Sequence, residues 1–175
     1  TNRLVGSEMC IRDRHEINPS ANSAYYLGLL KDKAGDSKSA LSYYEESLTL
    51  EVDNYKKASI LYKIAVKFKT RGLKTKSRQY ARKALKFQPS MGKAYLLIAN
   101  LYASSANDCG ETQFEKRSIY WLAAQQARKA ANVDPSTKKT ALSMAKSYEG
   151  RAPTRTDIFT EGKEGQIIIL SLIHI

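Results

Sequence analysis

Within residues 15–169 the sequence has one histidine, His15, and one cysteine, Cys109, and these side chains are of the types that serve as general base and nucleophile in enzymes. A cysteine attacks a substrate as its thiolate, which forms only beside a base or a cation. His15 stands ahead of the first predicted helix, and no histidine is close in sequence to Cys109. We therefore predict that His15 is a solvated loop residue and that Cys109 packs as a small apolar side chain. The sequence predicts a protein that is not an enzyme.

Metal and cofactor motifs are also missing from the sequence. Asp108, Glu111 and Glu115 lie close together but lack the alternating oxygen ligands of a calcium loop. No glycine-rich phosphate loop follows a predicted strand, and no pair of histidines has the spacing of metal ligands. We predict that the protein has no metal site and no cofactor.

A regular spacing of small and large side chains indicates a repeated structural unit instead. Segments that begin at Ala21, Ala58 and Gly92 align at a period of about 34 residues. Small side chains recur at the eighth position (Gly28, Ala65, Ala99), the twentieth (Ala40, Ser77) and the twenty-seventh (Ser47, Ala84). In the third segment an insert displaces the second helix by about a dozen residues, so the corresponding small residues are Ala123 and Ala130. Because only a small side chain fits where two helices cross closely, this pattern predicts helical hairpins. Pro89 and Pro135 mark the ends of second helices.

These residues resemble the tetratricopeptide repeat (TPR) family over about residues 21–148, with Lys31 and Val52 as departures from its pattern. The resemblance implies an all-α, TPR-type solenoid of about three helical hairpins and a closing helix. The predicted helices are Ser20 to Lys33, Ser37 to Thr49, Tyr55 to Thr70, Thr75 to Phe87, Gly92 to Ser104, a long helix that begins at a Thr112–Glu115 capping box and runs to Asn132, and Ser136 to Glu149. The third hairpin contains an insert at 106–113.

The resemblance also implies a binding surface, because the first helices of TPR hairpins line a concave groove. The candidate partner-binding residues at the family's groove positions are Asn22, Tyr25, Leu29, Lys33, Tyr62, Val66, Lys69, Lys93, Leu96 and Asn100, and the same positions include Asp32, Ser59, Thr70, Ala103 and Ser104. Tyr25 and Tyr62 either contact a partner or pack between repeats. Lys93 alone matches the clamp by which chaperone-binding members hold a peptide carboxylate. We expect a scaffold that binds a protein or peptide partner through this groove.

A basic stretch supports an alternative hypothesis. The chain has a net charge of +12, and no Asp or Glu occurs from Asn54 to Asn107. Such a field attracts nucleic acid or an anionic surface. Many of its cations, including Arg78, Arg82, Lys83 and Lys86, fall on predicted second helices, where a solvated face is the simpler interpretation.

Both ends of the chain are interpreted as translated sequencing adapter. Met9 to Asp13 and Leu170 to Ile175 back-translate to DNA strings that are reverse complements of each other. We therefore divide the chain into adapter-derived residues 1–14, the solenoid at 15–149, an extended tail at 150–169 that is truncated, and adapter-derived residues 170–175. With Cys10 set aside, no intramolecular disulfide is expected.

The tail and the cellular context follow from this division. Thr156 to Phe159 is expected to be an extended strap, and Gly165 to Ile169 the start of a β-strand. Within residues 15–169 no apolar run is long enough to span a membrane, so this part is expected to be soluble. The insert and Glu149 to Pro153 resemble the C-terminal part of a group of bacterial TPR proteins. The native N-terminus is expected to be missing, which leaves cytoplasm and periplasm both open.

Overall fold

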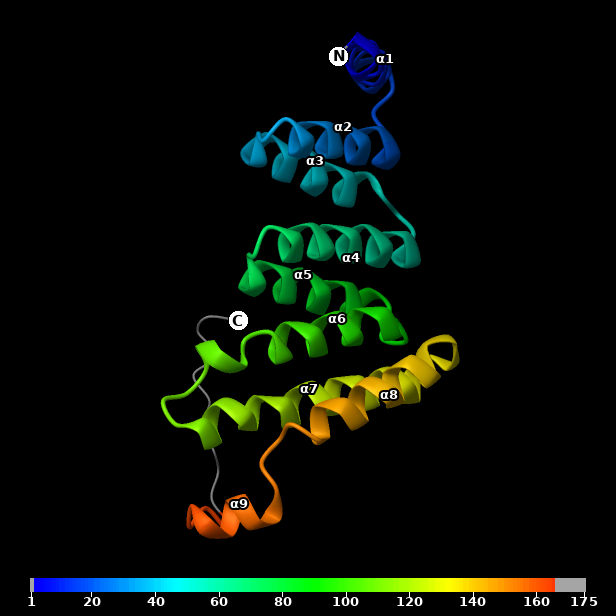
Figure 1. Ribbon diagram of the computed structural model, residues 1–175. Helices are drawn as coiled ribbons and strands as arrows, with labels where there is room; N and C mark the ends of the chain where they lie inside the picture. The colour runs from blue at the N-terminus through cyan, green and yellow to red at the C-terminus, as the bar shows by residue number, and fades with distance from the viewer. Residues whose placement is uncertain (1, 166–175) are drawn as a thin grey trace. The chain divides into compact units, whose positions relative to one another are not determined.

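The computed structural model describes residues 2–165, which form helices and turns and contain no β-strand (Figure 1). Neighbouring helices pack in pairs, which confirms the predicted all-α fold of the TPR-like solenoid class. The chain divides into two compact units between Ile64 and Ala65, inside one helix. Each unit is described separately below.

The first unit contains the first predicted hairpin. Its helices are α1 (Asn2–Ile17), α2 (Ala21–Lys33), α3 (Ser37–Leu50) and the beginning of α4 (Asn54–Thr70). Gly35 has a positive φ of 83° in the turn between α2 and α3, and the Asp36 carboxylate accepts a hydrogen bond from the Ser39 amide at 3.1 Å. Asp36 thus caps the N-terminus of α3.

A close helix crossing holds α2 against α3. A Cβ atom added to Gly28 would lie 2.7 Å from ring carbons of Tyr44 and 3.2 Å from the Ala40 carbonyl oxygen. The Ser47 hydroxyl also donates a hydrogen bond to the Ala21 carbonyl oxygen at 2.6 Å. The small residues that set the sequence period therefore lie at the crossing, as predicted.

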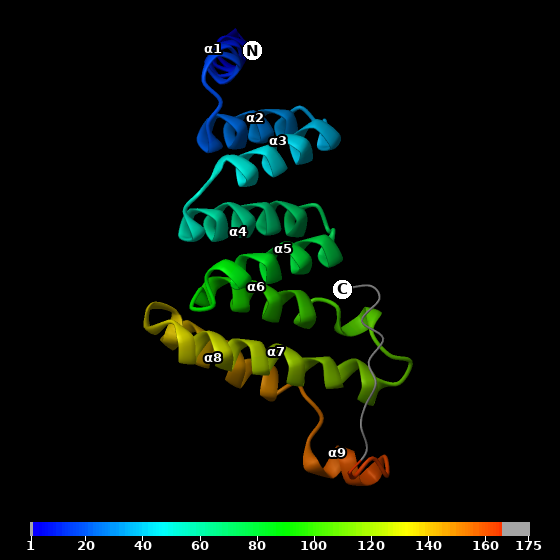
Figure 2. The same cartoon turned by 180° about the vertical axis from the view of Figure 1, so that it is seen from behind.

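The second unit begins at Ala65 and contains the remaining helices. These are α5 (Lys74–Phe87), α6 (Gly92–Ala103), the 3-10 helix η1 (Ala106–Asp108), α7 (Gln113–Val133), the 3-10 helix η2 (Pro135–Thr137), α8 (Lys138–Glu149) and α9 (Arg155–Thr160). Figures 1 and 2 show α6 and α7 side by side and antiparallel, with α8 running back along α7. Pro89 and Pro135 follow the ends of α5 and α7, which confirms their predicted role.

The core of the second unit is built from the predicted small positions. The Ser77 hydroxyl donates to the Ala65 carbonyl oxygen at 2.7 Å, so α5 crosses α4 at this pair. Ala99 on α6 and Ala123 on α7 are both fully buried. Thr112 and Glu115 form the predicted capping box at the start of α7.

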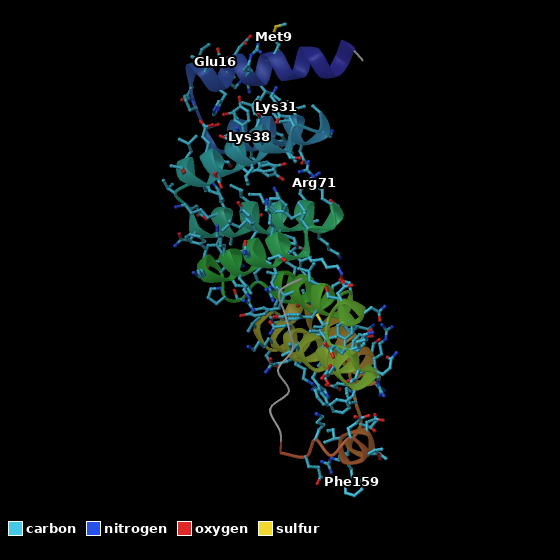
Figure 3. The ribbon with its side chains drawn as sticks, turned by 90° about the vertical axis from the view of Figure 1, so that its left-hand side faces the viewer. Met9, Glu16, Lys31, Lys38, Arg71 and Phe159 are labelled. Carbon is cyan, nitrogen blue, oxygen red and sulfur yellow. The ribbon has the colours of Figure 1, made fainter. Side chains whose placement is uncertain are left out.

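The expected extended strap in the tail is wrong, because residues 155–160 form the helix α9. Thr154 and Asp157 make a reciprocal capping box, and backbone hydrogen bonding from Thr154 lowers the pKa of the Asp157 carboxyl. Phe159 on this helix is exposed (Figure 3). The predicted strand at 165–169 starts at Gly165, which lies in a turn, and its other residues lie outside the described part.

Arg117 on α7 fastens the chain between α8 and α9. Its guanidinium donates to the carbonyl oxygens of Arg151 at 3.1 Å and Ala152 at 3.0 Å, and its Nη2 lies 3.2 Å from Asp157 Oδ2. One side chain therefore satisfies two backbone acceptors and pairs with the cap of α9.

Gly28→Ala is expected to destabilise the protein by roughly 1–3 kcal/mol, because the added methyl overlaps the Tyr44 ring in a packed crossing. Urea unfolding followed by far-UV circular dichroism measures the change. Gly150→Ala is the control, since its φ is −66° and the nearest atom to a new Cβ lies at 3.6 Å. The control should be neutral or slightly stabilising. Equal stability of wild type and Gly28→Ala would refute the close crossing.

Arg117→Ala is expected to accelerate amide hydrogen exchange in α9 by about tenfold or more, since each lost hydrogen bond is worth on the order of 1 kcal/mol. Arg128→Ala is a matched control on the same helix, because Arg128 Nε bonds Glu149 Oε1 at the end of α8 at 2.6 Å. Equal exchange of α9 in wild type and Arg117→Ala would show that the tail is held by other contacts.

Candidate functional site

A pocket in the second unit lies between the C-terminal half of α6 and the end of α8. Its volume is about 380 Å³, and its lining consists of Asn100, Ala103, Ser104, Met144, Ser147, Tyr148 and Arg151. The lining combines apolar atoms with an amide, hydroxyl groups and a guanidinium. Such a mixture fits a ligand that presents both an apolar body and hydrogen-bonding groups.

The polar side of the pocket is held by an aromatic stack. The Asn100 side chain is hydrogen-bonded to the Tyr148 hydroxyl, and the Tyr148 ring stacks on Tyr120 of α7 with centroids 6.3 Å apart. Arg151 Cζ lies 5.7 Å from the Tyr120 ring centroid. Burial raises the pKa of Tyr148, while the Asn100 hydrogen bond and the charge of Arg151 oppose that rise. Tyr148 is therefore a neutral donor and acceptor at physiological pH.

The structure brings part of the predicted groove set of the second unit to this pocket. Asn100 is in the lining, together with Ala103 and Ser104 from the same family positions. Leu96 instead packs against the buried cluster of Ala130, Ala131 and Ala141. Outside the pocket lining, Val66 is half-buried, and Lys69 and Lys93 are exposed.

In the first unit, Tyr25 is the predicted groove residue whose packing the structure describes. Its half-buried ring lies 5.6 Å from the Tyr44 ring between centroids, and Lys63 Nζ lies 4.9 Å above it. Burial is the main cause that raises the pKa of Tyr25, and it also raises that of Tyr62. The remaining residues are exposed or half-buried: Asn22 and Lys33 are exposed, and Leu29 and Tyr62 are half-buried. Tyr25 thus packs within its unit and keeps an accessible edge.

The sequence analysis did not predict that residues of α8 line a site, although the spacing of their side chains indicates it. Ala141, Met144, Ala145 and Tyr148 have the same spacing as Tyr95, Ile98, Ala99 and Tyr102 on α6. By this spacing α8 corresponds to the first helix of a further repeat, displaced by the insert. Its side chains next to those of α6 were therefore candidates for the same surface.

The prediction that His15 is a solvated loop residue is wrong. His15 lies in α1 and is 8% exposed, with Nδ1 2.7 Å from Ser23 Oγ and Nε2 2.9 Å from Glu46 Oε1. The partners come from α2 and α3, which sequence proximity could not reveal. Ser23 Oγ also belongs to the capping box of α2 with Ser20, so this cluster ties three helices together.

The prediction for Cys109 is confirmed, since its side chain is fully buried. Burial raises the pKa of its thiol, with a smaller contribution from the charge of Asp108, while Lys74 and Arg78 act in the opposite direction. In the described part of the chain, no group of three or more His, Cys, Asp and Glu side chains is placed to hold a metal ion.

Comparison with known proteins finds a relative that matches more than half of this chain. The chain is 32% identical over 107 residues to the photosystem I assembly protein Ycf3 of Cyanophora paradoxa, a match that covers 56% of this chain and 62% of that protein. The chain thus spans about three fifths of the length of this relative. No family model matches. Cyanophora paradoxa is an alga, so the bacterial origin of the present chain stays a prediction.

The comparison and the fold support the same general class of protein. Both are compatible with a helical-repeat protein of the TPR type. Among residues 2–165, no helix combines the length and the apolar character that a membrane span requires.

The two cysteines should differ sharply towards a thiol reagent. Cys10 is exposed, so it should react with Ellman's reagent at pH 8, whereas buried Cys109, with its raised pKa, should react only after unfolding. Absorbance of released thionitrobenzoate counts the thiols. Cys10→Ala should abolish the fast reaction and leave one thiol in denaturant. A fast reaction that persists in Cys10→Ala would contradict the burial of Cys109.

Proposed function

We propose that this chain is a non-enzymatic scaffold that binds an extended segment of a partner protein, with the pocket between α6 and α8 as a contact site. The observation that carries the proposal is the convergence of Asn100, Tyr148 and Arg151 beside the apolar side chains of Ala103 and Met144. These groups match what a polypeptide offers, namely backbone amides and carbonyls next to side chains.

The chemistry of each group supports a peptide ligand. A side-chain amide such as Asn100 both donates and accepts, so it can bond the backbone of an extended chain without demanding a particular side chain. Arg151 supplies a cation beside Tyr148, and tyrosine and arginine contribute strongly to protein interfaces. Met144 adapts its shape to varied apolar side chains.

The relative supports a protein as the class of partner. Ycf3 of Cyanophora paradoxa is named as an assembly protein, and assembly requires contacts with other protein chains. The predicted residues of the first unit, above all Tyr25 with its accessible edge, would supply a further contact surface on that unit.

The test is selection of peptides from a displayed random library on the wild-type chain, followed by titration of the selected peptides against variants. Asn100→Ala should weaken binding by about tenfold, because a lost hydrogen-bonding partner costs on the order of 1–1.5 kcal/mol. Tyr148→Phe, which keeps the ring and removes the hydroxyl that Asn100 contacts, should weaken binding less.

The matched control is Asn132→Ala, an exposed amide on α7 that is not in the pocket lining. Its affinity should equal that of the wild type, and circular dichroism should show all variants folded. The proposal fails if no peptide is selected, or if Asn100→Ala and Asn132→Ala bind the selected peptides equally well.

A further inference from the structure

The second helix of the middle hairpin, α5, carries a concentration of positive charge. It contains Lys74, Lys76, Arg78, Arg82, Lys83 and Lys86 and no acidic residue. Its inward side consists of Ser77, Tyr80, Ala81 and Ala84, all buried. Lys74 is ion-paired with Asp108 at 2.7 Å. The other five cations, Lys76, Arg78, Arg82, Lys83 and Lys86, are exposed or half-exposed and are called the basic face below.

Aromatic rings hold most of these cations in place. Lys76 Nζ lies 5.7 Å from the Phe68 ring centroid, and Lys83 Nζ lies 4.8 Å from that of Tyr80. Tyr102 of α6 contacts two cations. Its ring centroid lies 5.9 Å from Arg78 Cζ, and its hydroxyl accepts a hydrogen bond from Arg82 Nη2 at 3.2 Å. These contacts restrict the cationic side chains before a ligand arrives, so binding costs less side-chain conformational entropy.

The cations form two rows along α5. Arg78, Arg82 and Lys86 follow each other at four-residue steps, which correspond to a rise of about 6 Å each. Lys76 and Lys83 are two helical turns apart on the other flank. The exposed neutral side chain of Gln79 lies between the rows by helix periodicity. A regular array of this kind fits a ligand with regularly repeated negative charges.

We propose that the basic face binds the phosphate backbone of double-stranded nucleic acid without recognising base sequence. Phosphate contacts by lysine and arginine supply most of the affinity in such binding. A single strand would also need accessible rings on which bases stack. The rings beneath these cations cannot serve, because Phe68 and Tyr80 are each 8% exposed and Tyr102 is 3% exposed.

Other acidic partners fit this surface less well. The core of a protein interface is depleted in lysine and relies on apolar or aromatic anchors, whereas the exposed apolar residues nearest this face, Leu73 and Phe87, lie at the two ends of α5. A helix that lies on a membrane inserts an apolar side into lipid. The apolar side of α5 is buried within its own repeat.

This inference goes beyond the proposed function and does not rest on it. No residue of the basic face lines the pocket of α6 and α8. Loss of peptide binding in Asn100→Ala and loss of nucleic-acid binding in variants of α5 are therefore separable results.

The experiment measures fluorescence anisotropy of a labelled random-sequence DNA duplex titrated with the full chain between about 50 and 200 mM NaCl. The wild type should bind, and five phosphate contacts predict a fall of log affinity with log salt of slope roughly −4.5. Lys83→Glu combined with Lys86→Glu should weaken binding by about tenfold or more and flatten the slope by about 2. Should that variant unfold, Lys83→Gln with Lys86→Gln is measured instead, with the same flattening expected.

The matched control is Lys138→Glu combined with Lys139→Glu, which changes the net charge equally at two exposed positions of α8. It should lower affinity by less than about threefold through the long-range field alone. Equal losses in the two double variants would overturn the proposal. So would absence of binding at low salt, or displacement of the duplex by single-stranded DNA, polyglutamate or phosphatidylserine vesicles at lower charge concentration than by unlabelled duplex.

Discussion

The close approach of paired helices is the constraint on which the rest of this structure depends. Gly28 admits the Tyr44 ring, and the Ser77 hydroxyl reaches the Ala65 carbonyl oxygen. Dense packing leaves no room for larger side chains at these points, so each hairpin has one allowed register. Once Ala99 is fixed at the crossing, Asn100 and Ala103 face away from it and become available to line a pocket.

Helix periodicity then separates two kinds of chemistry on the second unit. The first helix α6 and the corresponding helix α8 present neutral polar groups and one guanidinium around a pocket. The second helix α5 turns its small and aromatic residues inward and its cations outward. Four of its cations, Lys76, Arg78, Arg82 and Lys83, contact aromatic residues, and Lys74 is paired with Asp108. A neutral recognition site and a charged surface therefore coexist in one unit without sharing residues.

The sequence predicted most of the helices because their signals are local. Thr112 caps α7 where predicted, and Pro89 and Pro135 follow helix ends. Helix α9, which the sequence analysis did not predict, also has a local signal, the capping box of Thr154 and Asp157. The β-branched residues of the tail favour an extended structure and oppose that signal. The burial of His15 could not be predicted in this way, because it depends on Ser23 and Glu46 from two other helices. No local sequence pattern indicates contacts between three helices.

The sequence by itself determined the repeat, the hairpins and the concentration of positive charge from Asn54 to Asn107, because these follow from residue size, periodicity and composition along the chain. Only the tertiary structure decided that Asn100 meets Tyr148, that Leu96 packs into the core, and that Tyr102 holds Arg78 and Arg82. The insert after α6 shifts α8 out of the repeat period. Because α8 packs against α7, it still takes the place of a first helix, like α6. A period measured along the chain does not show this spatial equivalence.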